Sequence, residues 1–216
     1  MSITRKAGPT IGCLMIEDFL KEDSISEDFS AGGPSLSGLC AFLREAGICT
    51  EVFRWTGRGD IHTCLQEAYH NMRSRCATAC IAADGSGILG AVALGAQLPV
   101  ERMVLMDGGY KTGEASAKLK SGIRRLGRYV RRSAAFCVAD VLMVPNPCGK
   151  RGMWFQEIGR QLVNCRIESA AYCGPNNHNI CTNGEHFTEK QISGFLLNGE
   201  YPKYHAQNSE MCIIYE

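Results

Sequence analysis

The segment Ile81–Gly90 constrains the fold of this chain more than any other. Its first half has the composition of a buried strand, and its second half opens a helix-type stretch of small residues that ends near Pro99. The two halves meet abruptly at a turn of mostly small residues, Ala83-Asp84-Gly85-Ser86-Gly87. A tight strand-to-helix turn of this kind holds a side chain above the carboxyl edge of a parallel sheet. The segment therefore predicts a parallel α/β fold with a candidate functional group at the turn.

Strand-type and helix-type segments alternate along the rest of the chain. We expect strands at 11–16, 48–53, 78–83, 103–106, 138–144 and 167–172, and helices at 35–46, 61–75, 88–98, 115–132, 153–163 and 189–197. Strands that alternate with helices of this length are typical of a parallel sheet covered on both faces. We therefore predict one three-layer α/β domain over residues 1–216 with a mostly parallel sheet, to which residues 211–215 could add an edge strand.

Composition fits a single domain with a sizeable core. The chain has 216 residues, of which 45% are apolar and 21% charged, and its net charge is +1. This charge gives no overall attraction to nucleic acid or to acidic membranes. No run approaches the roughly 20 apolar residues of a membrane span, and residues 1–9 lack the apolar core of a signal peptide. We expect a cytoplasmic protein without a membrane partner and with little affinity for nucleic acid.

The twelve cysteines are spread along the chain rather than spaced like a disulfide framework. Several lie inside apolar runs, namely Cys13, Cys40, Cys49, Cys80 and Cys137. Cysteine in such a run behaves as a small apolar residue, whereas secreted scaffolds place cysteines in loops. We expect reduced thiols in the core.

In open parallel sheets, ligands bind at the carboxyl ends of the strands. The residues that directly follow the predicted strands are therefore the candidates for function. They are 17–18, 55–60, 84–86, 107–109, 146–148 and 174–178.

The order of these pieces resembles the α/β-hydrolase superfamily. Residues 38–60 look like that family's passage of helix, glycine, strand and G-x-G, and residues 81–99 look like its nucleophile elbow with the following helix. Residues 104–107 look like the next strand, and residues 141–144 look like the strand that usually precedes the acid of the catalytic triad. Asn177-His178 lies about as far before the last helix as the family's histidine does.

The resemblance covers residues 11–198 and implies an α/β-hydrolase-like three-layer domain. The strand 11–16 would take the place of the family's third strand, so the domain would be trimmed at its N-terminus. Relatives insert a lid domain where this chain has the helix 115–132, which is too short for a large lid.

The family's elbow reads small-x-nucleophile-x-small, and this chain fits it in three registers. With Ala83 and Gly87 at the small positions, Gly85 occupies the nucleophile position and offers no reactive side chain. A shift by one residue makes Asp84 the nucleophile, as in the dehalogenase branch, and the opposite shift makes it Ser86. Without catalysis, the side chains of Asp84 and Ser86 would serve as caps at the positive end of the following helix.

The other catalytic positions of the family are altered as well, except for the histidine. Glu17-Asp18 stands where the family has the His-Gly of its oxyanion hole, and carboxylates there repel an oxyanion unless they bind a cation or point away. The loop 145–150, which usually supplies the triad acid, has no carboxylate. Asp107 is an alternative acid that would orient His178 as general base, or else it simply closes a turn.

No pattern in the sequence indicates a metal or another cofactor. Cysteines and histidines gather at 173–186 and at His62 with Cys64, but without the C-x2-C or H-x3-H spacing of zinc sites. Cys148 beside His178 would offer a thiol nucleophile, although its loop is where the family places the acid.

The helix 115–132 is basic along one side. Its apolar stripe consists of Leu119, Ile123, Leu126 and Val130, and its basic residues are Lys118, Lys120, Arg124, Arg125, Arg128, Arg131 and Arg132. Such a helix either packs on the sheet with a solvated basic face or docks an anionic partner or another subunit.

Three hypotheses for function follow. The leading one is an α/β-hydrolase-like protein with a degenerate catalytic site and a residual cleft for a small-molecule ligand, either as a monomer or as a homo-oligomer. The second is a small serine esterase or lipase-type hydrolase that acts on a carboxylic ester through Ser86, Asp107 and His178. The third is an interaction module that uses the basic helix.

Overall fold

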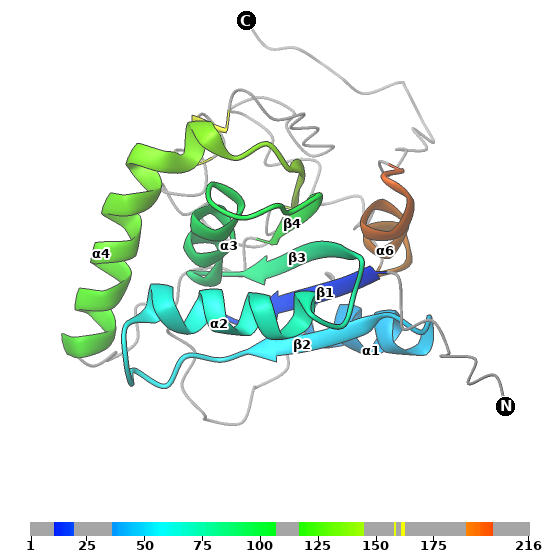
Figure 1. Ribbon diagram of the computed structural model, residues 1–216, viewed down its shortest axis with the longest axis horizontal. Helices are drawn as coiled ribbons and strands as arrows, with labels where there is room; N and C mark the ends of the chain where they lie inside the picture. Colours follow the sequence, from blue (N-terminus) through cyan, green and yellow to red (C-terminus); the bar gives the residue numbers. More distant parts are fainter. Residues whose placement is uncertain are drawn as a thin grey trace, which may run out of the picture.

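The computed structural model describes residues 11–19, 36–106, 117–144, 158, 161–162 and 189–200. In this part of the chain, five parallel strands form one sheet in the order β2-β1-β3-β4-β5 (Figure 1). The strands are β1 (Ile11–Ile16), β2 (Cys49–Phe53), β3 (Thr78–Asp84), β4 (Arg102–Met106) and β5 (Asp140–Val144). The predicted parallel sheet is confirmed.

Helices cover both faces of the sheet and give the predicted three layers. One face carries α2 (Ile61–Arg73) and α3 (Gly87–Gly95), and the other carries α1 (Leu36–Glu45) and α6 (Glu189–Asn198). The basic helix α4 (Ala117–Ser133) packs against α2 and α3 rather than directly on the sheet, and a 3-10 turn, η1 (Ala134–Phe136), follows it. The predicted strand 167–172, the edge strand 211–215 and most of the helix 153–163 lie outside the described residues.

Alternate side chains of the central strands enter two separate cores. On β1, Leu14 and Ile16 belong to the core under α2 and α3, whereas Cys13 and Met15 belong to the core under α1 and α6. All four side chains are at most 1% exposed. Because both faces of a central parallel strand are covered, every position along it is apolar. This is why β1 and β3 read as unbroken apolar runs.

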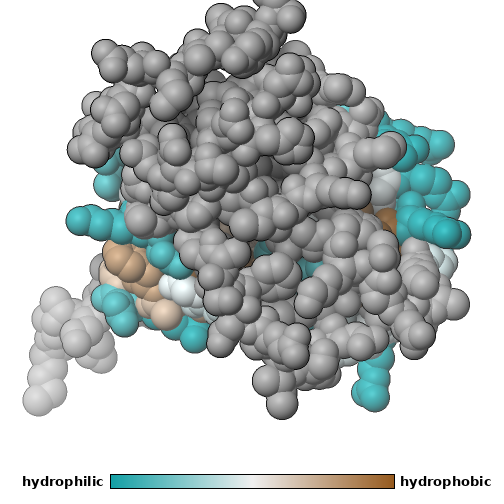
Figure 2. All heavy atoms as spheres, turned by 180° about the vertical axis from the view of Figure 1, so that it is seen from behind, coloured by the Kyte–Doolittle hydropathy of each residue, from teal (hydrophilic) through white to brown (hydrophobic). Residues whose placement is uncertain are grey.

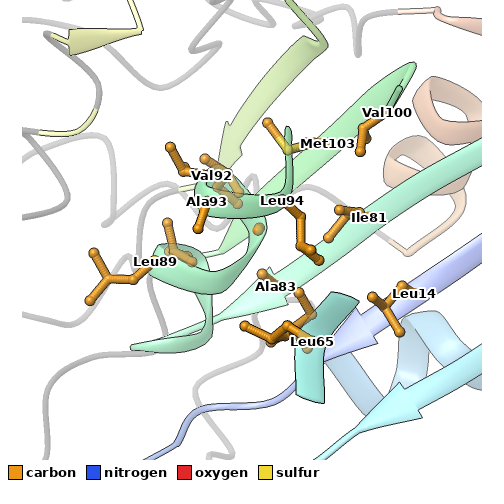
Figure 3. Close-up of a cluster of buried hydrophobic side chains, with 14 of the residues drawn as sticks. Leu14, Leu65, Ile81, Ala83, Leu89, Val92, Ala93, Leu94, Val100 and Met103 are labelled. Atoms are coloured by element: carbon orange, nitrogen blue, oxygen red, sulfur yellow. The ribbon is translucent and has the colours of Figure 1, made fainter. Parts of the chain in front are cut away.

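The helix α3 is enclosed on every side, and all nine of its residues are buried. Its side chains pack among those of β3 and β4 (Figure 3). A Cβ atom on Gly87 would lie only 2.7 Å from the backbone oxygens of Ile16 and of Glu17. The first turn of α3 therefore lies directly against the end of β1, which requires glycine at this position.

Of the element boundaries that differ from the prediction, two have a clear structural cause. β5 begins at Asp140, which pairs in register with Arg102, and not at residue 138. Val138 is 81% exposed and does not join the sheet, although its apolar side chain extends the apolar run. α3 ends at Gly95 instead of residue 98, because the chain then turns toward Pro99 and β4.

The cysteines of the described residues are not disulfide-bonded, and most of them are buried. Cys13, Cys40, Cys80 and Cys137 lie in the core as predicted, and Cys49 is half-buried at the start of β2. Burial raises the pKa of the Cys80 thiol to about 11, and it raises the pKa of Cys13 well above its usual range. Both thiols therefore stay protonated at neutral pH and act as small apolar groups.

We predict that Cys80 makes the protein less stable at alkaline pH. Its pKa rises from the ordinary 9.0 to about 11 in the folded protein. Between these values the unfolded thiol loses its proton while the folded thiol keeps it, so the free energy of unfolding falls as pH rises. Between pH 8 and 10.5, the free energy of unfolding of the wild type should fall by on the order of 2 kcal/mol more than that of Cys80→Ala. Urea unfolding at a series of pH values measures both. Equal losses in the two proteins would contradict this assignment.

Candidate functional site

The turn between β3 and α3 has glycine at its tip. Gly85 has φ +54°, in the left-handed region that favours glycine, whereas Ser86 has a helical φ of −68°. The Gly85 amide donates a hydrogen bond to the carbonyl oxygen of Met106 at the end of β4, with a distance of 3.1 Å. Gly85 therefore occupies the tip, as the register with Ala83 and Gly87 at the small positions predicts.

The carboxylate of Asp18 fills the space above this tip. A Cβ atom on Gly85 would lie 2.6 Å from Cγ and 2.7 Å from Oδ2 of Asp18. Oδ1 of Asp18 accepts hydrogen bonds from the Ser86 amide, at 3.1 Å, and from the Ser86 hydroxyl. The place where a nucleophilic side chain would project from the turn is thus taken by a carboxylate that comes from the loop after β1.

Ser86 points into the protein. Its side chain is 0% exposed, and its Oγ donates to Asp18 while accepting a hydrogen bond of 2.9 Å from the Phe19 amide. Ser86 is the N-cap residue of α3, but its hydroxyl makes no capping hydrogen bond to that helix. Ser86 therefore takes the predicted N-cap position, but its hydroxyl joins α3 to the β1 loop instead of capping the helix.

Glu17 and Asp18 behave differently although they are neighbours. Glu17 faces outward and forms an ion pair with the exposed Arg54, at 2.5 Å between Oε2 and Nε, and its amide donates to the Phe53 carbonyl. Asp18 turns inward to Ser86. Of the two exceptions that the sequence leaves for these carboxylates, cation binding applies to Glu17. The Asp18 carboxylate instead points into the turn.

The structure describes only some of the remaining candidate residues. Asp84 is half-buried at the end of β3, opposite Met106 in the register with β4. Asp107, Cys148, His178 and the cysteines and histidines of 173–186 lie outside the described residues. His62 packs its ring 5.3 Å from that of Tyr129, and within the described ranges no three His, Cys, Asp or Glu residues gather as a metal site would need.

The Asp18 carboxylate occupies the electropositive end of α3. Backbone amides at a helix N-terminus and the helix dipole together favour a negative group. In an elbow used for acyl transfer, the amide that follows the nucleophile donates to the developing oxyanion. The corresponding amide here is that of Ser86, and it donates to Asp18. Sequence reasoning found Asp18 as a departure from the family pattern, but it did not find the partners Ser86 and Phe19.

The chain resembles known proteins in its architecture. No family model matches the chain, and no curated protein matches it. A solved structure connected with the metagenome-derived lipolytic enzymes LipS and LipT matches at a TM-score of 0.52 and 12% identity, over 76% of this chain and 82% of that one. This chain has an α/β-hydrolase-like fold. An α/β-superfamily protein described as a hydrolase, from Xanthomonas campestris pv. campestris, matches at 0.45 and 14% identity, over 85% and 90% of the two chains.

The α/β-hydrolase-like fold confirms the resemblance inferred from the order of the sequence segments. In this fold, the tight turn from a strand into a buried helix at the carboxyl edge is the nucleophile elbow, and the β3–α3 turn has that architecture. Nowhere in the described ranges is there a helix of the length and apolarity needed to cross a membrane.

We predict that Gly85→Ala is more destabilising than an ordinary glycine substitution with positive φ. Gly47 is the matched control, because it has φ +77° and a Cβ atom added to it would have no other atom within 4 Å. Gly47→Ala should cost about 1–2 kcal/mol through backbone strain alone. Gly85→Ala should cost at least about 2 kcal/mol more, because the new methyl group overlaps Asp18.

A double-mutant cycle in urea unfolding tests the cause of that excess. In an Asp18→Gly background, Gly85→Ala should cost about as much as Gly47→Ala does, because the overlapping carboxylate is gone. If the excess cost persists without Asp18, its carboxylate is not what excludes a side chain at the tip.

Proposed function

We propose that this protein is an α/β-hydrolase-like protein that does not use its elbow for hydrolysis, and that it acts through binding. The observation that carries the proposal is the Asp18 carboxylate above Gly85, bound to the amide and the hydroxyl of Ser86. In this proposal the turn is a structural joint between the β1 loop and α3. We also propose that a small-molecule ligand binds at the carboxyl edge of the sheet.

Electrostatics supports this assignment. Acyl transfer creates a negative oxygen beside the elbow, and hydrogen-bond donors must face it. At about 4 Å, a second negative charge opposes it by about 4 kcal/mol at an effective dielectric constant of about 20. The Asp18 carboxylate supplies such a charge and also uses the Ser86 amide as its own donor. A tetrahedral intermediate would meet repulsion where it needs stabilisation.

The alternative of a serine esterase requires Ser86 to reach a substrate carbonyl at about 3 Å. The fully buried Oγ of Ser86, with one hydrogen bond donated and one accepted, disfavours this chemistry. Asp84 belongs to β3 rather than to the tip with positive φ, which disfavours it as a carboxylate nucleophile. The roles of Asp107 and His178 stay predictions.

We predict that Ser86→Ala changes stability and leaves ester hydrolysis unchanged. The substitution removes the acceptor of the buried Phe19 amide, so it should cost about 1–3 kcal/mol of unfolding free energy. Ser193→Ala is the matched control: this serine is 2% exposed, and its hydroxyl bonds only locally to the Lys190 carbonyl. It should cost clearly less, and urea unfolding measures both.

A fluorophosphonate probe followed by intact mass measurement tests the absence of serine chemistry. Wild type, Ser86→Ala and Ser193→Ala should show no stoichiometric adduct, and all three should hydrolyse a short p-nitrophenyl ester at the same background rate. An adduct and an esterase rate that disappear in Ser86→Ala but persist in Ser193→Ala would establish the esterase and overturn the proposal. Halide release that is lost in Asp84→Asn would overturn it in favour of the dehalogenase alternative.

A further inference from the structure

The helix α4 carries the strongest charge segregation in the chain. Seven of its seventeen residues are Lys or Arg, and none is Asp or Glu. Since the whole chain carries +1, the residues outside α4 carry a net charge of −6. The low net charge of the chain arises because a basic helix and an acidic rest of the chain nearly cancel. It therefore does not describe the electrostatic potential around α4.

Packing fixes which side of α4 faces outward. Ile123, Leu126 and Val130 are at most 8% exposed in the core with α3. A Cβ atom on Gly122 would overlap the ring of Trp55, so the helix lies directly against that ring. At 100° per residue, the basic positions cover an arc of about 160° on the opposite side.

The arginines on this arc are exposed and have few partners. Arg124, Arg125, Arg128, Arg131 and Arg132 are exposed. Among the residues that the structure describes, only Arg125 has an acidic partner, Asp60, at 3.7 Å. α4 forms an outer edge of the molecule (Figure 1), and hydrophilic residues line that edge in the view from behind (Figure 2).

Two large apolar side chains follow directly after the last arginines of α4. Phe136 in η1 is 69% exposed, and Val138 is 81% exposed. The next most exposed large apolar side chain of the described residues is Val52, at 41%. Phe136 and Val138 are thus the two most exposed large apolar side chains of the described residues, and both follow Arg131 and Arg132 closely in the chain.

We propose that α4 and η1 form a docking surface for an anionic lipid bilayer. The arginines bind the phosphates and carboxylates of the headgroups, and Phe136 with Val138 enters the boundary of the acyl chains. A helix of 17 residues is about 25 Å long, so the basic positions of α4 can meet a flat surface together. A nucleic-acid duplex would satisfy the arginines but gives neither apolar side chain a role. A single strand could stack a base on Phe136 but gives Val138 no role, which is why the bilayer is favoured. This surface is independent of the β3–α3 turn.

The test is cosedimentation of the purified protein with phosphatidylcholine vesicles, with and without about one third phosphatidylserine. The protein should bind the anionic vesicles and not the neutral ones, and binding should weaken at least about tenfold in 0.5 M salt. The variant Arg124→Glu/Arg128→Glu/Arg131→Glu should also bind at least about tenfold more weakly. Phe136→Ser/Val138→Ser should weaken binding with its salt dependence unchanged and with little loss of stability, because both side chains are exposed in the folded protein.

The matched control is Arg44→Glu/Arg58→Glu/Lys190→Glu, which changes the net charge equally at exposed positions outside α4. It should bind within about twofold of wild type if α4 carries the contact. Equal loss in the two triple variants would show attraction to net charge alone and overturn the proposal. Absence of binding to anionic vesicles would also overturn the proposal. So would binding to single-stranded RNA that persists at a salt concentration that releases the vesicles.

Discussion

The hydrogen bonds between Asp18 and Ser86 hold the centre of this fold together. They join the loop after the central strand β1 to the first turn of α3, the helix that is buried on all sides. A buried helix end leaves amide groups that need acceptors. Asp18 provides one, and glycine at positions 85 and 87 allows the chain segments to approach. The turn, the helix and the strand end therefore depend on one another.

The contact between Asp18 and Ser86 also uses the features of the fold that favour an anion. An α/β-hydrolase-like fold provides a sharp turn and a helix dipole at the carboxyl edge of its sheet, and these features favour any anionic group. In this protein the anion is part of the chain. The stabilising interaction that an acyl-transfer site reserves for a transition state is already made in the resting protein. In the function proposed above, the glycine at the tip and the Asp18 contact are two aspects of one arrangement.

The sequence predicted the layers well because the central strands β1 and β3 are largely apolar and the covering helices α1 and α2 each have one apolar stripe. Val138 was assigned to a strand because apolar composition does not distinguish an exposed side chain from a buried one. The direction of Asp18 could not be predicted, since its place exists only where Gly85, 67 positions later, lacks a side chain. The stripe of α4 was evident from spacing, whereas its packing against α3 and the Trp55 ring was not. Asp107 and His178 lie outside the described residues, and their roles stay predictions.

The position of β1 has a consequence for how the chain acquires its structure. β1 is the first described strand, yet it lies between β2 and β3 and pairs with both in parallel. Its loop is tied to Ser86, 68 positions away in the chain. Closing such long loops slows folding. During synthesis at about 5–20 residues per second, β1 leaves the ribosome several seconds before its second neighbour exists. Until β3 emerges, one edge of β1 has no partner strand, and an unpaired edge of an apolar strand favours aggregation.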